Sequence, residues 1–137
     1  MRKLTLVALA SISIGLVAVC ATALAAKPRP LGFYAGKYAT VEIDETGKNV
    51  SSFNGDCTPV KHPAYTFSVT WGIPVNAKGK IKWKRSNAVN TPDGGTLLPT
   101  SKVTIEAEFI SATEVEGTYQ LHKPGCKAIK FDAKLEQ

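Results

Sequence analysis

The residues of this chain that could do chemistry are few, and the most conspicuous lie in the basic segment Lys80–Arg85. The segment reads Lys-Ile-Lys-Trp-Lys-Arg, so cations surround a tryptophan, as in sites for anionic polymers such as nucleic acid or teichoic acid. Side chains of a strand alternate between its two faces, so the lysines and Trp83 would point in opposite directions. We therefore expect that Trp83 does not stack on a ligand held by Lys82.

A purely structural interpretation of this segment competes with binding. Ile81 and Trp83 would pack in the core, while the lysines would protect an edge strand from aggregation. Glu106 and Glu108, on a neighbouring strand, would neutralise them. A further loop, Ser86–Thr100, is long enough to be functional or simply an exposed connection. The candidate binding residues are Lys80, Lys82, Lys84 and Arg85, with Pro92, Asp93 and Gly94 in the loop.

Two cysteines that follow the N-terminal segment, Cys57 and Cys126, favour a disulfide, because an even pair in an exported domain is usually oxidised. Such a bridge closes a loop of about 70 residues and contributes on the order of 4 kcal/mol. His62 and His122 lie near these cysteines in the sequence, so a tetrahedral zinc site is an alternative. The spacing matches no common zinc motif, and we expect the disulfide and no metal.

The sequence contains no recognisable catalytic motif. No Gly-x-Ser-x-Gly surrounds any serine, and the disulfide would remove a cysteine nucleophile. The clustered carboxylates alternate with apolar residues, which is typical of a solvated strand face and not of an acid–base pair. They are Glu106, Glu108, Glu114 and Glu116. We expect a non-enzyme without a cofactor.

Two segments carry oxygen ligands of the kind that calcium uses, Asp44-x-x-Gly47 and Asp93-Gly94-Gly95. Neither reproduces a known calcium-binding loop. Aspartate and glycine at these spacings are typical of turns, so we interpret both segments as connections between strands.

Most of the chain that would position these residues shows a hydrophobic period of two. The apolar residues of each segment alternate with polar ones, and Gly- or Pro-containing turns separate the segments. The expected strands lie at 39–43, 50–53, 65–71, 80–84, 103–109, 115–121 and 129–135. This pattern predicts an all-β, antiparallel β-sandwich, immunoglobulin-like or a small barrel, with about seven or eight strands and one disulfide.

The first 25 residues predict a secretory signal peptide. Arg2 and Lys3 precede an apolar run that ends at an Ala-x-Ala site, and cleavage after Ala25 would leave residues 26–137 as a single all-β domain. Lipidation at Cys20 is an alternative, although Val19 does not suit the lipoprotein peptidase. An uncleaved anchor is another, and would be the protein's only link to a membrane. We expect a secreted, cell-surface or periplasmic location.

Several short motifs resemble those of a family of exported bacterial β-sandwich domains with two cysteines and no established function. The resemblance implies a two-cysteine sandwich and no catalytic residues. The motifs are Gly32-x-Tyr34-x-Gly36, Gly47-Lys48-x-Val50-x-x-Phe53, Val103-x-Ile105-x-Ala107-x-Phe109, Glu116-Gly117-Thr118-Tyr119, Gly125-Cys126 and Phe131-x-Ala133.

The chain has a net charge of +6 but no run of like charges. This favours mild attraction to anions over dedicated nucleic-acid binding. The sequence thus predicts a non-catalytic binding or structural module at the cell surface or in the medium. Its expected partner is a cell-envelope polymer or another secreted protein. The alternative function is a small secreted inhibitor of a hydrolase, or a small hydrolase itself.

Overall fold

The computed structural model describes residues 25–57, 67–70, 72–86 and 102–137, and within these every regular element is a β-strand. The predicted signal segment lies outside them except for Ala25, as does most of the loop Ser86–Thr100. In the same part of the chain no helix could span a lipid bilayer. The strands are β1 (Phe33–Gly36), β2 (Ala39–Ile43), β3 (Asn49–Gly55), β4 (Phe67–Val69), β5 (Ile73–Pro74), β6 (Lys80–Ser86), β7 (Lys102–Ser111), β8 (Glu114–His122) and β9 (Ile129–Leu135).

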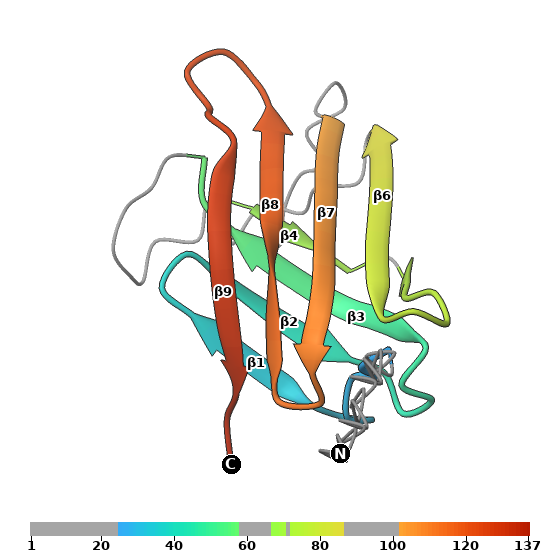
Figure 1. The fold of residues 1–137 in the computed structure, drawn as a ribbon. Helices are drawn as coiled ribbons and strands as arrows, with labels where there is room; N and C mark the ends of the chain where they lie inside the picture. Colours follow the sequence, from blue (N-terminus) through green and yellow to red (C-terminus); the bar gives the residue numbers. More distant parts are fainter. Residues whose placement is uncertain (1–24, 58–66, 71, 87–101) are drawn as a thin grey trace, which may run out of the picture.

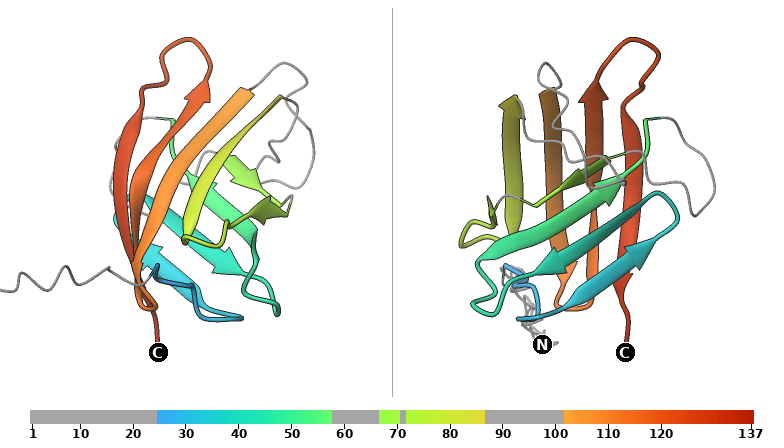
Figure 2. Two further views of the ribbon diagram at one scale, coloured as in Figure 1. Left: turned by 45° about the vertical axis from the view of Figure 1, so that its right-hand side comes forward. Right: turned by 180° about the vertical axis from the view of Figure 1, so that it is seen from behind.

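All nine strands belong to one antiparallel sheet with the order β4-β3-β2-β1-β9-β8-β7-β6, and β5 pairs with β3. The sheet curls on itself, so that β6–β9 form one layer and β1–β5 cross behind it (Figures 1 and 2). The predicted all-β antiparallel fold is confirmed. Because β1 pairs with β9 and joins the two layers, the architecture is the barrel-like form of that prediction.

The structure contains two strands, β1 and β5, that the hydrophobic period does not predict. β1 contains Tyr34 as its one buried residue and ends at Gly36, so it shows no alternation to detect. β5 is two residues long and ends at Pro74. Both strands form because their neighbours supply hydrogen-bonding partners, which a local pattern cannot reveal.

Gly36 allows the close approach of β1 to β9 at the bend of the sheet. It pairs with Ala133, and a Cβ atom at position 36 would collide with the backbone carbonyl of Asp132. Glycine is therefore required for geometry at this position, since only a residue without a side chain leaves room for the partner strand.

The core fills the space between the two layers and consists of the inward members of each alternating strand. The predicted inward positions Val41, Val103 and Ile105 are fully buried, whereas Trp83 is only partly buried. Four aromatic rings form the centre of the core, with centroids 5.2 to 6.2 Å apart where they touch. They are Phe53, Phe67, Tyr119 and Phe131.

Two buried tyrosines join strands to distant loops through their hydroxyl groups. Tyr119 Oη donates to the carbonyl of Tyr38 at 2.6 Å and accepts from the amide of Asp56 at 3.0 Å. Tyr34 Oη donates to the carbonyl of Ala112 at 2.7 Å. Each hydroxyl thus satisfies backbone groups that lie far away in sequence, which burial otherwise makes costly.

The disulfide Cys57–Cys126 is present and confirms the predicted pairing. It joins the end of β3 to the turn before β9, across a sequence separation of 69 residues. The amide of Lys127 also donates to the carbonyl of Cys57 at 3.0 Å, so the crosslink lies within a local backbone contact between the two layers.

Replacing both Cys57 and Cys126 with serine should lower the melting temperature by more than about 10 °C. The reason is that a bridge over a loop of about 70 residues contributes on the order of 4 kcal/mol through restriction of the unfolded chain. Thermal unfolding followed by circular dichroism measures the effect. A melting temperature within a few degrees of the parent would contradict a structural role.

Tyr119→Phe should reduce the free energy of unfolding by about 1–3 kcal/mol, because two backbone groups lose their partner while the ring remains packed. Tyr38→Phe is the matched control, since no hydrogen bond of the Tyr38 hydroxyl is found within the described residues. Its effect should stay within about 0.5 kcal/mol. Urea unfolding of both variants makes the comparison, and equal effects would contradict the assignment.

Candidate binding face

The outward side chains of β6, β7, β8 and β9 form a charged face that the strand register divides into rows. The acidic row consists of Lys80, Glu108, Glu116 and Asp132. The mixed row consists of Lys82, Glu106, Thr118 and Lys130. The face exists because apolar residues at the intervening positions turn inward to the core, which leaves only polar residues for solvent.

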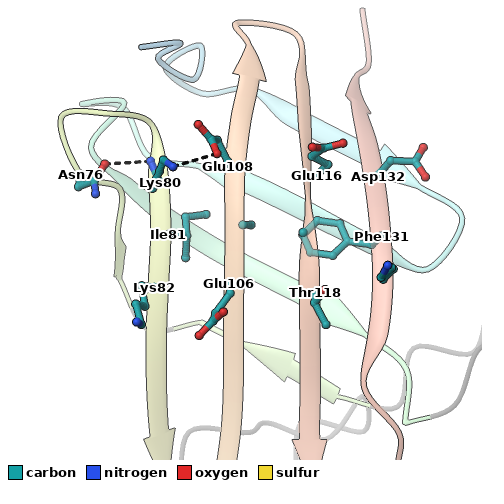
Figure 3. Close-up of a pocket in the computed structure, with 13 residues that line it drawn as sticks. Asn76, Lys80, Ile81, Lys82, Glu106, Glu108, Glu116, Thr118, Phe131 and Asp132 are labelled. Carbon is teal, nitrogen blue, oxygen red and sulfur yellow. Dashed lines mark hydrogen bonds and ion pairs between the residues drawn. The ribbon is translucent and has the colours of Figure 1, made fainter.

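A groove of about 740 Å³ crosses this charged face and takes lining residues from all four strands. In Figure 3 the acidic row and the mixed row lie on either side of Ile81 and Phe131. Ala107 and Gly117, small residues of the same intervening row, also line it. An open groove lined by charges is suited to an extended polar ligand, whereas enclosed apolar pockets are typical of small-molecule sites.

Lys80 is neutralised at one end of the groove. Its Nζ lies 3.2 Å from Glu108 Oε2, and its backbone amide donates to Asn76 Oδ1 at 2.9 Å (Figure 3). Both ionic side chains are about half exposed, so the pair contributes at most about 1 kcal/mol to stability. Its consequence is electrostatic, because the charge of Lys80 is cancelled locally.

Carboxylates predominate in the rest of the acidic row. Glu116 pairs in register with Glu108 on one side and with Asp132 on the other. Like charges directly opposite each other destabilise a sheet slightly, so this arrangement makes one end of the face negative. Within the described residues no group of histidine, cysteine or acidic side chains could hold a metal ion.

The opposite end of the face is positive, and we call the side chains of Lys84, Lys102, Thr104 and His122 the basic end. Lys84 is opposite Thr104, and Lys102 is opposite His122, so the four come from three adjacent strands. Thr104 Oγ1 lies 2.8 Å from His122 Nε2. The hydrogen-bonding contact of the Lys84 side chain lowers the pKa of Lys102, and partial burial and the like charge of Lys84 lower it further.

The candidate binding residues from the sequence fall into three groups. Lys80, Lys82 and Lys84 are exposed on the charged face, while Arg85 is exposed but turns to the other side of β6. Trp83 lies on the side opposite the lysines, as predicted. The loop residues Pro92, Asp93 and Gly94 lie outside the described residues.

Sequence reasoning missed Lys102 as a partner of these lysines. It is separated from Lys84 in the sequence by the loop Ser86–Thr100, and only the pairing of Ser86 with Lys102 brings the two together. Lys102 directly precedes the strand pattern of 103–109, which could have indicated that it extends that strand. The register between this strand and the lysine strand could not be known from the sequence.

The zinc alternative is wrong, because the two cysteines that it requires are bonded to each other. Of the two histidines it would use, His122 interacts with Thr104, and His62 lies outside the described residues. A cysteine in a disulfide has no thiolate to offer a metal.

Asp44 forms the turn that the sequence predicts, and its carboxylate is used within that turn. Its Oδ2 accepts from Asn49 Nδ2 at 2.8 Å, and its Oδ1 accepts from the hydroxyl of Thr46 at 2.8 Å and the amide of Lys48 at 3.2 Å. These hydrogen bonds, that from the Asn49 side chain foremost, lower the pKa of Asp44 to about 2. The other turn-like segment, at Asp93, lies outside the described residues.

Comparison of the chain with known protein families, characterised proteins and solved structures found no match. The resemblance to exported two-cysteine β-sandwich domains therefore stays a prediction.

Lys84→Gln should raise the pKa of Lys102 toward its ordinary value, because the substitution removes the ammonium group whose hydrogen-bonding contact and charge lower that pKa. A pH titration of the lysine side-chain carbon signals by NMR measures the change. Lys82→Gln removes the same charge one row further away and should change the pKa of Lys102 less. An unchanged pKa in Lys84→Gln would show that the two ammonium groups do not interact.

Proposed function

We propose that this protein is an exported, non-catalytic binding module that holds a polymer of the bacterial cell envelope. The observation that carries the proposal is the groove across β6–β9, to which four strands contribute charged side chains on a rigid sheet. Sites on regular strands hold their side chains more precisely than sites on loops do.

The charges of the groove support a polymer as the ligand. Lys82 and Lys130 lie in the mixed row on either side of Glu106 and Thr118, so cations are spaced across several strands rather than gathered at one point. A ligand that satisfies them must extend across the sheet. Neighbouring strands are about 4.8 Å apart, so crossing the row from β6 to β9 spans three such intervals.

The disulfide supports export, because such bonds persist in oxidising compartments. It is compatible with an extracellular location and joins the two layers of the sheet, which would maintain the groove outside the cell. The predicted signal peptide of residues 1–25 supports the same location.

The protein should therefore sediment with purified cell-wall material, and Lys82→Gln combined with Lys130→Gln should reduce the retained fraction by about fivefold or more, since two charge contacts are lost. Lys27→Gln combined with Lys48→Gln is the matched control, because it removes the same charge outside the groove. Co-sedimentation at increasing salt measures both pairs.

Two outcomes would contradict the proposal. In one, both double variants lose retention equally, which would mean that only the overall positive charge matters. In the other, the protein is not retained on the wall and instead forms a stable complex with a secreted hydrolase, which would support the inhibitor alternative.

A further inference from the structure

The lysines of β6 are equivalent in the sequence but not in the structure. Lys80 is paired with Glu108 at 3.2 Å. Lys84 and Lys102 have no carboxylate within ion-pair distance in the part of the chain that the structure describes. The charged face is therefore bipolar, and its basic end carries two cations without a carboxylate partner in the described part of the chain.

The basic end brings together two cations and two further polar groups on one surface. Lys84 and Lys102 lie on neighbouring strands, offset by two residues, because Lys102 is opposite Ser86. His122 lies opposite Lys102 on the next strand. Thr104 lies between them and contacts the His122 ring at 2.8 Å. All four side chains project to the same side, because their positions share the outward phase of the alternation.

We propose that the basic end binds a phosphate group of an anionic polymer, with Lys84 and Lys102 bridging its oxygens. This inference rests on the proposed function and names the chemistry of the ligand at the positive end of the same face. A phosphodiester offers two unesterified oxygens that share one negative charge, so one group can contact both ammonium groups at once.

The mutual repulsion of the two lysines favours such a ligand. Their proximity already lowers the pKa of Lys102, and a bound anion would relieve the repulsion and raise that pKa again. A carboxylate chain could also pair with lysine, but lysine is a point charge that commonly binds phosphate, and the hydroxyl of Thr104 and the His122 ring add polar partners for further oxygens.

The test is an NMR titration of the disulfide-bonded protein with inorganic polyphosphate at low salt. Lys84→Gln and Lys102→Gln should each weaken binding by about fivefold or more, because each removes a charge-assisted contact. Lys48→Gln is the matched control, since it removes the same charge outside both the groove and the basic end. It should change the affinity by less than about twofold, because no contact with the phosphate is lost.

A second arm identifies the source of the phosphate. Vesicles of phosphatidylglycerol are compared with vesicles of phosphatidylcholine, and the same three variants are measured on both. Dependence on Lys84 and Lys102 with polyphosphate supports a soluble or wall-bound phosphodiester. The same dependence with phosphatidylglycerol alone supports a lipid headgroup as the source.

Two results would overturn the inference: no binding to either probe, or equal losses of affinity in Lys48→Gln, Lys84→Gln and Lys102→Gln. Failure of the proposed wall-binding function can be distinguished from failure of the phosphate site. Retention on cell walls that depends on Lys82 and Lys130 but not on Lys84 or Lys102 would leave the binding module intact and refute only the phosphate site. Polyphosphate binding without retention on cell walls would support the phosphate site and refute the binding of a wall polymer.

Discussion

Hydrogen bonds between β1 and β9 connect an early strand of the described domain to its final strand and convert two layers into one curled sheet. The pairing requires Gly36, since a side chain there would collide with the partner backbone. Because β9 also pairs with β8, the position of β1 fixes the layer that carries the charged face. The disulfide and the Tyr119 hydroxyl reinforce this arrangement, as each connects the same two layers at another point.

The charged face shows how register produces a property that composition does not contain. The net charge of the chain is modestly positive, yet the face is negative at one end and positive at the other. Glu108 lies opposite Lys80, whereas Thr104 lies opposite Lys84. Two lysines of the same strand face therefore differ in their surroundings, since one faces a carboxylate and the other an uncharged hydroxyl. A shift of β7 by two residues along β6 would redistribute these partners without changing the core-facing alternation.

Much of the fold could be predicted because its longer strands alternate strictly. The segments around Val41, Ile105 and Phe131 form strands with the expected residues inward. β1 and β5 could not be predicted, since both are short and depend on partners for their conformation. The candidate lysines were identified, but their pairing with Glu108 or Lys102 depends on contacts between separate strands, which only the register determines.

The described chain enters and leaves the domain at one end. Ala26 packs against Gly79 just before β6, and Gln137 follows β9 at that same end (Figure 1). The basic end lies at the far side of β6–β8, where β6 finishes and β7 begins. An attachment at either terminus, whether to a surface or to a fused partner, would therefore leave the positive end directed away from the point of attachment and open to solvent.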